Sequence, residues 1–392
     1  MTPQARLQAA IELVDEIAAA AREGGAAADT LIARYFKSRR YAGSGDRRAV
    51  RELVFRAIRR AGEPPASGRA ALIGLAEDAP ELAPLFDGSA HGPLPIADEP
   101  AAARGIAPAW LLERFDPVIA AEELPTLLER APLDLRVNRL KAGREQAAAL
   151  LPEAAPTPIS PLGLRLPEGF RIEETDAWRD GLVEIQDEGS QLICLGCEAA
   201  PGTLIVDLCA GAGGKTLALA AEMAGEGRIV ACDTDRGRLS RMPPRLERAG
   251  VANVEARLLN PGHETEALSD LAGRADLVLV DAPCSGTGTW RRNPETRWRV
   301  TPDRLERLTA LQARLLDLGA TLIRPGGILA YAVCSLLAEE GRDQAAALGA
   351  RSSLVPEPLP IKAGREAGTG LLLSPGRDGT DGFFVARWQR PC

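Results

Sequence analysis

The pattern of apolar and polar positions divides the chain into a helical beginning and a later alternation of strands and helices. In residues 3–23, apolar side chains recur at spacings of three and four, which is typical of an amphipathic helix, and residues 28–36 repeat the pattern. A third apolar stripe with this spacing lies in residues 50–58. We therefore expect an all-helical domain over residues 1–90, followed by a linker over residues 91–103, where glycine and proline break the period.

Residues 104–186 have the pattern of a small α/β subdomain. Apolar and polar side chains alternate in residues 133–138, which predicts a strand with one polar face. Residues 162–166 and 183–186 predict two further short strands, and residues 144–151 predict a helix between them.

From residue 187 to residue 392, short apolar runs alternate with helical stretches, of which the longest is residues 302–323. This alternation is typical of an α/β fold with a doubly wound (Rossmann-like) sheet that carries helices on both faces. Ligands of such sheets bind beyond the carboxyl ends of the strands. The predicted strands are residues 204–208, 229–232, 277–280, 328–333 and 383–386.

A glycine-rich turn follows the first of these strands and precedes a helical pattern. Glycine allows a tight turn in which the backbone approaches a ligand closely. A phosphate-binding loop would need glycine where Cys209 stands, and the dinucleotide fingerprint would need a third glycine in register, so neither motif is present. A loop that holds a methionine nucleoside remains, with a plain glycine-rich turn as the alternative. The candidate residues of this loop are Cys209, Ala210, Gly211, Ala212, Gly213, Gly214 and Lys215.

The second strand ends at Asp233. An acidic residue about 20 residues after a glycine loop is well placed to accept hydrogen bonds from two ribose hydroxyls. Asp233 is therefore the candidate ribose ligand. Capping of the next helix, by Asp233 or Asp235, is the alternative interpretation.

Composition places the chain among soluble globular proteins. It has 392 residues, of which 45% are hydrophobic and 26% charged, and this length allows two or three domains. No apolar run reaches the ~18 residues of a membrane span, and residues 1–6 are not followed by the apolar core of a signal peptide. Seven scattered cysteines are typical of a reducing compartment. We expect a cytoplasmic monomer that makes no membrane contact.

The net charge of −7 does not predict a nucleic-acid partner for the chain as a whole, but the charge is unevenly distributed. Residues 34–60 hold ten basic and two acidic side chains, a local charge of +8. We favour a patch that binds RNA phosphates through Arg47, Arg48 and Arg51, because residues 44–46 predict a glycine-flanked turn beside them. A solvated helical face is the alternative.

Two cysteines follow neighbouring strands of the predicted sheet. Cys284 stands three residues after Asp281, and Cys334 directly follows Val333. A lone cysteine is usually a small buried apolar residue, but two at the ligand edge of one sheet indicate chemistry. A thiolate that adds to carbon 6 of cytosine makes carbon 5 nucleophilic toward a sulfonium methyl group. The second thiol then assists release, Asp281 is the candidate acid near the ring nitrogen, and the base must be unpaired or flipped out.

These motifs together resemble the Sun/RsmB-type RNA (cytosine-5) methyltransferases. The resemblance covers about residues 104–388 and implies a class I methyltransferase domain over residues 187–392. Residues 45–48, at the amino-terminal end of the chain, resemble the NusB-like RNA-binding module found on one branch of the family. The motifs that carry the resemblance are residues 136–141, 186–191, 208–216, 281–286, 331–336, 339–340 and 379–384.

The resemblance also implies a cofactor and roles for individual residues. The cofactor is S-adenosylmethionine, held by residues 209–215 together with Asp233 and Asp281. Cys334 is the nucleophile, and Cys284 is the residue needed for product release.

The sequence departs from the family pattern at four places. Ala212 stands where proline is usual, and Val333 replaces the threonine that usually precedes the nucleophile. Leu258 occupies the position of an aspartate that contacts the cofactor, and Asn260 is the nearest polar substitute. Residues 243–244 are two prolines inside an expected helix, which we therefore expect to be split into two short pieces.

Four further polar side chains are candidates for RNA contacts. Arg136 and Asn138 are expected to point outward from the first strand of the small subdomain, either toward RNA or simply into solvent. Arg291 and Arg292 follow the Cys284 motif, where they would clamp the RNA backbone beside the flipped base. An ordinary charged loop is the alternative for this pair.

A metal site is not expected. Cys194 and Cys197 form a Cys-x-x-Cys pair, but zinc would need a second pair of ligands. The only two histidines, His91 and His263, are distant in sequence, so buried packing of both thiols on one helix is the expected arrangement.

We therefore expect an enzyme that methylates carbon 5 of a cytosine in RNA, with rRNA rather than tRNA as the substrate. Two alternatives stay open: a tRNA cytosine-5 methyltransferase, and a non-catalytic RNA-binding or ribosome-assembly factor, which the loss of the acid at Leu258 would explain. A DNA cytosine methyltransferase fits less well, because its Pro-Cys motif supplies the nucleophile and the Cys334 motif has no counterpart there.

Overall fold

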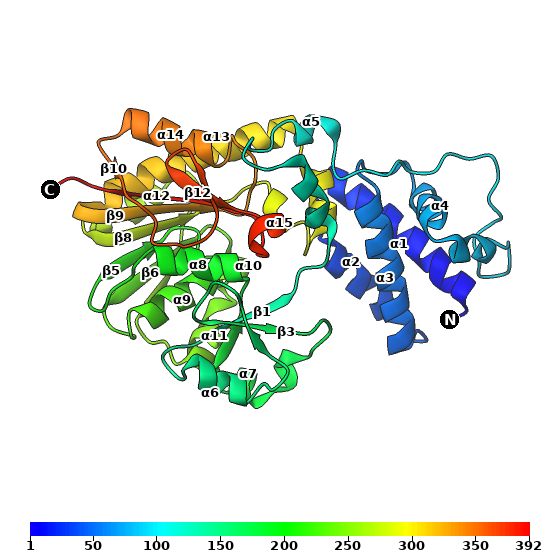
Figure 1. Cartoon of the computed structure of the whole chain (residues 1–392), viewed down its shortest axis with the longest axis horizontal. Helices are drawn as coiled ribbons and strands as arrows, with labels where there is room; N and C mark the ends of the chain where they lie inside the picture. The colour runs from blue at the N-terminus through cyan, green and yellow to red at the C-terminus, as the bar shows by residue number, and fades with distance from the viewer. The chain divides into compact units, whose positions relative to one another are not determined.

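The computed structural model describes residues 1–392 and divides into two compact units, which we call the helical unit and the sheet unit (Figure 1). The chain passes between them several times. The helical unit consists of Met1–Phe115, Ala121–Glu129 and Ser285–Arg304. The sheet unit consists of Asp116–Ala120, Arg130–Cys284 and Leu305–Cys392.

Four helices with one shared apolar core form most of the helical unit. They are α1 (Pro3–Glu23), α2 (Ala28–Ser38), α3 (Ser44–Arg60) and α4 (Gly68–Asp78). The apolar stripes of the sequence face this core, which confirms the helices predicted there. Beyond the 3-10 helix η1 (Pro80–Leu85), residues 91–103 contain no helix or strand, and their role as a linker stays a prediction. The likeness of this unit to NusB stays a prediction.

The turn predicted at residues 44–46 is wrong, because α3 already begins at Ser44. Gly43 precedes the helix in an extended conformation, and its N–H donates to the Asp46 carboxylate at 3.1 Å. This bond satisfies a backbone donor at the start of the helix, so the following arginines lie on a helix and not in a loop.

A segment from far along the chain completes the helical unit. Ser285–Arg304, which contains the 3-10 helices η5 (Thr287–Thr289) and η6 (Pro294–Arg299), packs on α1 and α3. The Trp298 side chain belongs to the same apolar core as these helices. We call this stretch the 285–304 segment.

Arg297 fixes the 285–304 segment to the carboxyl end of α3. Its fully buried guanidinium donates to the carbonyl oxygens of Arg59 and Ala61, at 3.0 and 2.8 Å, and to that of Ile58. The last carbonyls of a helix have no partner within the helix, and a cation there complements the helix dipole. Burial lowers the pKa of Arg297, because the charged guanidinium is removed from water.

The sheet unit is built around a nine-stranded sheet with the order β11-β12-β13-β9-β8-β5-β6-β7 and β10 paired to β13. The pairs from β9 to β7 are parallel, whereas β13 runs antiparallel to β9. This topology confirms the doubly wound α/β fold. The strands are β5 (Leu204–Asp207), β6 (Arg228–Asp233), β7 (Val254–Leu258), β8 (Ala275–Asp281), β9 (Ile323–Val333), β10 (Val355–Pro356), β11 (Arg365–Ala367), β12 (Gly370–Leu373) and β13 (Phe383–Gln389).

Helices cover both faces of the sheet (Figure 1). On one face, α8 (Glu188–Gly196) and α9 (Gly214–Glu222) share an apolar core with side chains of β5, β6, β8 and β9. On the other face lies α13 (Pro302–Leu322), together with α14 (Arg342–Arg351). Gly319 lets α13 approach closely, because a Cβ there would lie only 2.8 Å from the Leu329 side chain.

Residues 243–244 split the helix after β6 as expected. The two pieces are α10 (Arg236–Leu239) and α11 (Met242–Ala249), with the prolines in the first turn of α11. Proline is tolerated there because the first turn has no intrahelical use for its missing N–H.

A second sheet with the order β2-β3-β1-β4 lies in the same unit and has its own apolar core. Its strands β1 (Leu133–Val137), β3 (Gly163–Leu166) and β4 (Val183–Ile185), with α6 (Arg144–Ala149), match the predicted elements. The short strand β2 (Ala155–Pro156) was not expected. The domain boundary expected between residues 186 and 187 stays a prediction. No helix of the chain is long and apolar enough to cross a membrane.

Candidate active site

The two cysteines predicted to act together lie in contact. Strands β8 and β9 are parallel neighbours, with Asp281 opposite Ala332, so their carboxyl ends come together at one edge of the sheet. The loops beyond these ends bring the sulfur atoms of Cys284 and Cys334 to 3.3 Å from each other. Neither cysteine is in a disulfide, and both are partly exposed.

An ion pair lies beside the thiols. The Lys215 ammonium, in the first turn of α9, donates to the Asp281 carboxylate at 2.7 Å. Burial acts to lower the pKa of Lys215, but the neighbouring negative charge of Asp281 outweighs it and the net shift is upward. The role of Asp281 as an acid toward the base stays a prediction.

Gln312 is a supporting residue that the sequence analysis missed. It lies on α13, is fully buried, and donates both to the Pro283 carbonyl at 2.9 Å and to the Glu340 carboxylate at 3.0 Å. The hydroxyl of Tyr331 in turn donates to the Glu340 carbonyl at 2.6 Å. These bonds tie the loop before Cys284 to the loop after Cys334. The sequence did contain one sign of this role, because Gln312 is a polar residue on the apolar face of the helix predicted at residues 302–323.

Two glycines of the glycine loop adopt a backbone conformation that other residues rarely adopt. Gly211 and Gly213 have φ values of 56° and 84°, in the left-handed region, and α9 begins directly after them. The N–H of Gly211 donates to the Asp233 carboxylate at 2.7 Å, and the N–H of Asp235 donates to its other oxygen at the same distance. Asp233 thus shapes the loop, while Asp235 caps α10. The cap of α10 is therefore Asp235, and the role of Asp233 as the ribose ligand stays a prediction.

A second buried acid lies under the loop. Asp207 at the end of β5 is fully buried and accepts a hydrogen bond from the Thr216 hydroxyl at 2.7 Å. Removal from water raises the pKa of Asp207 to about 7. This residue was not among the predicted site residues, although it ends the strand that leads into the glycine loop.

The end of β7 carries no acid. Leu258 pairs with Asp233 across the strands and packs against an apolar cluster that contains Ala210 and Met242. Asn260 is exposed, and its backbone carbonyl accepts from the His263 N–H at 3.0 Å. Whether Asn260 takes over the missing contact stays an open prediction.

Arg136 and Asn138 are not exposed, and the expectation that they point outward is wrong. Only 3% and 2% of these residues are accessible. The Arg136 Nε donates to Gln186 at 2.6 Å, and the Asn138 amide donates to the carbonyls of Gly181 and Ala249. The reason is that β1 pairs with strands on both sides and α8 lies against it. Both residues therefore stabilise the fold and are withdrawn as RNA contacts.

The expected clamp after Cys284 is also not an exposed loop. Arg291 and Arg292 belong to the 285–304 segment of the helical unit. Arg291 is buried, and its carbonyl accepts from Arg59, whereas Arg292 is partly exposed. Because a buried guanidinium does not reach an RNA backbone, the prediction that Arg291 clamps the RNA is wrong.

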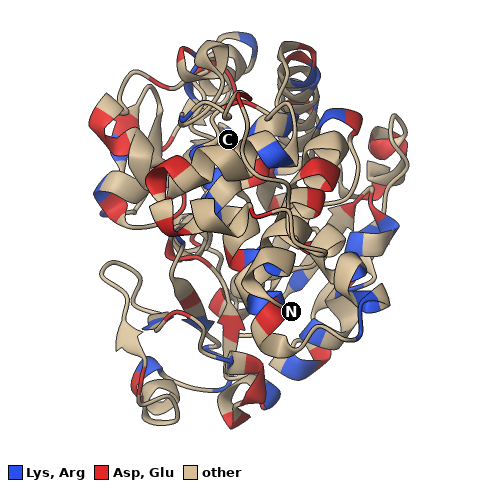
Figure 2. Cartoon of the chain, turned by 90° about the vertical axis from the view of Figure 1, so that its right-hand side faces the viewer, with Lys and Arg blue, Asp and Glu red and all other residues tan.

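Three arginines of the predicted phosphate patch are exposed on α3. They are Arg47, Arg48 and Arg51. Arg51 pairs with Asp29 at 2.9 Å, and the Arg47 Nε donates to the Ala42 carbonyl at 3.0 Å. Figure 2 shows basic positions in blue on the helices around the amino terminus. Their contact with RNA stays a prediction.

The Cys-x-x-Cys pair is buried as expected, with Cys194 in α8 and Cys197 directly after it. Cys194 and Cys197 are nearly inaccessible, and burial raises the pKa of Cys194 to about 12. No group of three or more histidine, cysteine, aspartate or glutamate side chains is arranged to hold a metal ion.

Comparison with known proteins places the chain in a family. Residues 196–389 match the family model of the 16S rRNA methyltransferase RsmB/F. Ribosomal RNA small subunit methyltransferase B of Pasteurella multocida (strain Pm70) is 34% identical over 295 residues, which cover 72% of this chain and 65% of the relative. The chain thus spans about two thirds of the length of that curated relative.

Solved structures share the fold. A methyltransferase homolog protein from Pyrococcus horikoshii is 30% identical, with a TM-score of 0.61 over 68% of this chain and 89% of that one. The structure of PH0851 is 23% identical and has a TM-score of 0.74 over 98% of this chain and 99% of that one, which is a likeness of fold. With the class I methyltransferase fold and the paired cysteines described above, these matches show that the chain belongs to the RsmB/F family of methyltransferases.

Proposed function

We propose that this protein transfers a methyl group from S-adenosylmethionine to carbon 5 of a cytosine in RNA. The observation that carries the proposal is the 3.3 Å separation of the Cys284 and Cys334 sulfur atoms at the ligand edge of the sheet. Two thiols in contact with one base serve a reaction that both forms and breaks a sulfur–carbon bond. The relatives named as small-subunit rRNA methyltransferases support rRNA as the substrate.

The thiols perform complementary steps in the proposed reaction. The Cys334 thiolate bonds to carbon 6, and the electron pair displaced to carbon 5 takes up the methyl group. The Cys284 thiolate lies close enough to take up the proton that leaves carbon 5, which converts Cys284 to a neutral thiol. Loss of this proton restores the double bond and expels the Cys334 thiolate, so atoms and charge balance. Gln312 keeps the two loops in register during both steps.

The residues around the glycine loop fit the proposed cofactor. Gly211 and Gly213 adopt left-handed conformations beside Asp233. Lys215 pairs with Asp281 at the end of the neighbouring strand β8. We assign the ribose to Asp233 and the remaining contacts to the loop. When bound, the cofactor supplies an electrophilic methyl group.

The function is tested by the position of the methyl group. The full chain is incubated with methyl-labelled S-adenosylmethionine and protein-free small-subunit rRNA, and the RNA is digested to nucleosides for mass spectrometry. We expect 5-methylcytidine, and none when Cys334→Ala replaces the wild type. Label on another atom would contradict the proposal, and label on tRNA but not rRNA would favour the tRNA alternative.

A non-catalytic assembly factor is the second candidate, and Leu258 is the observation that favours it. An apolar side chain at the end of β7 removes a polar contact from the cofactor side of the sheet. This candidate predicts RNA binding without any methylated nucleoside in the same assay.

Asp233→Ala is expected to weaken cofactor binding by at least about 1.5 kcal/mol, roughly tenfold, because a charged acceptor is lost. The same change frees the Gly211 N–H from the carboxylate. Calorimetry with S-adenosylmethionine measures the effect, and Asp235→Asn, which keeps the cap of α10, is the matched control. Equal affinity of Asp233→Ala and wild type would remove Asp233 from the site.

A further inference from the structure

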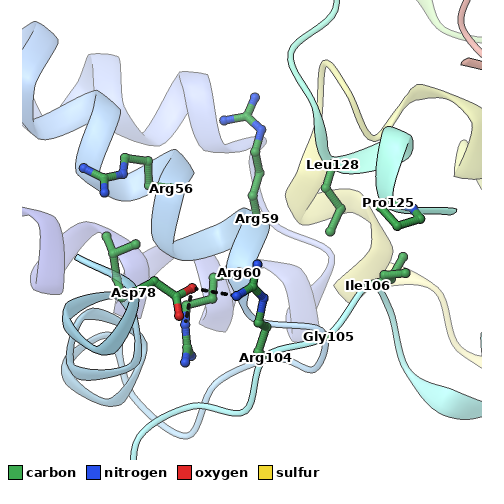
Figure 3. A pocket seen from close by; sticks show the side chains of 10 residues that line it. Arg56, Arg59, Arg60, Asp78, Arg104, Gly105, Ile106, Pro125 and Leu128 are labelled. Atoms are coloured by element: carbon green, nitrogen blue, oxygen red, sulfur yellow. Dashed lines mark hydrogen bonds and ion pairs between the residues drawn. The ribbon is translucent and has the colours of Figure 1, made fainter. Parts of the chain in front are cut away.

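A pocket of about 490 Å³ in the helical unit is rich in arginine (Figure 3). Four guanidinium groups line it, from Arg56, Arg59 and Arg60 at the end of α3 and from Arg104. Asp78 is the acidic residue among the lining side chains. We call this cavity the arginine pocket.

The acids near the pocket do not neutralise it. Asp78 accepts from Arg60 at 3.1 Å and lies 3.4 Å from Arg104, and Glu77 pairs with the same Arg60. Figure 3 shows Arg60 and Arg104 both directed at Asp78. The Arg56 side chain makes no hydrogen bond or ion pair within the chain. The pocket therefore has a surplus of positive charge, and this surplus attracts an anion.

The opposite wall of the pocket is apolar. Ile106, Pro125 and Leu128 line it, and Figure 3 shows these three facing the arginines. A bare phosphate would need only the basic side. A cavity of this volume with one basic and one apolar wall matches a nucleotide, whose phosphate is charged and whose base has an apolar face.

The pocket lies at the end of a basic helix. Arg56 lies nine residues after Arg47 on α3, which is about 13 Å along the axis at 1.5 Å per residue. Because nine residues make two and a half turns at 3.6 residues per turn, Arg56 projects from the side of α3 opposite Arg47, so the pocket is a basic site apart from the exposed arginines.

We propose that the arginine pocket binds one nucleotide of a single-stranded RNA segment, with its phosphate on the arginines and its base against the apolar wall. The proposal rests on RNA as the substrate of the proposed function. It adds an RNA site in the helical unit, separate from the cysteines of the sheet unit.

The test compares two pairs of substitutions in the full chain. Arg56→Gln with Arg104→Gln removes two charges from the pocket, and Arg304→Gln with Arg307→Gln removes two from the exposed start of α13. Affinity for a labelled single-stranded oligoribonucleotide is measured against salt concentration without cofactor. We expect the pocket pair to lower the slope of log affinity against log salt by about 1.4, since each arginine contact to phosphate contributes roughly 0.7. The control pair should keep the wild-type slope.

Arg56→Gln alone tests whether an effect of the pocket pair comes from unfolding, because the Arg56 side chain has no hydrogen bond or ion pair within the chain to lose. We expect this variant to melt like the wild type and to lower the slope by roughly 0.7. A slope equal to that of the control pair would overturn the proposal. Displacement of the oligonucleotide by equal concentrations of AMP or inorganic phosphate would overturn it too, in favour of a small-molecule site. Since binding is measured without methyl transfer, loss of methylation activity alone leaves this result unaffected.

Discussion

Replacing Cys284 with alanine is expected to abolish turnover and to accumulate a covalent complex between the protein and its RNA. Cys334 still attacks carbon 6 in this variant and the methyl group is still transferred. The neighbouring sulfur, 3.3 Å away in the wild type, is no longer present to take the proton from carbon 5. The adduct therefore persists and is seen as a shifted band on a denaturing gel after incubation with RNA and cofactor.

Cys334→Ala should abolish turnover without any complex, since no sulfur–carbon bond forms. Cys392→Ala is the matched control, because this exposed thiol lies at the end of the chain and should leave activity unchanged. A complex in Cys334→Ala but not in Cys284→Ala would reverse the two roles. A wild type without methylation, with no complex in either variant, would favour the non-catalytic candidate.

Arg297→Ala is expected to lower the free energy of unfolding by about 3 kcal/mol or more. The substitution leaves the buried carbonyl of Ile58 and the partly buried carbonyl of Arg59 without this donor, and loss of a partner by a buried acceptor costs roughly 1–3 kcal/mol. It also removes a cation from the carboxyl end of α3. Urea denaturation of the full chain measures the change.

Arg299→Ala provides the comparison for Arg297. Arg299 donates to the carbonyls of Gly25 and Ala26, but it is partly exposed, so water replaces the lost donor. We expect this variant to lose less than about 1 kcal/mol. An Arg297→Ala protein no less stable than Arg299→Ala would refute the capping role.

The sequence was sufficient for those features that depend on local pattern. The apolar runs of β5, β6, β8 and β9 are buried on both faces, so they read as strands, and their order placed Cys284 and Cys334 at one edge. Strand β7 was not predicted from its pattern, because it is only partly buried and carries Glu255 and Arg257.

Features that depend on distant contacts were not predicted. The burial of Arg136 and Asn138 results from packing around β1, which the alternation of residues 133–138 does not encode. The polar Gln312 is recognisable as a bridge only once both cysteine loops are in place. For the same reason the 285–304 segment read as a loop beside the catalytic strands, although its hydrogen bonds go to helices near the amino terminus.

The position of Arg297 in the chain has a consequence for synthesis. Arg297 lies 239 residues after its acceptor at Ile58. At about 5–20 residues per second, the helices leave the ribosome roughly 10–50 s before the residue that caps α3 is made. Trp298, which belongs to their apolar core, arrives equally late. The helical unit therefore completes its fold only after most of the sheet unit has been made, and until then its apolar core lacks the Trp298 side chain.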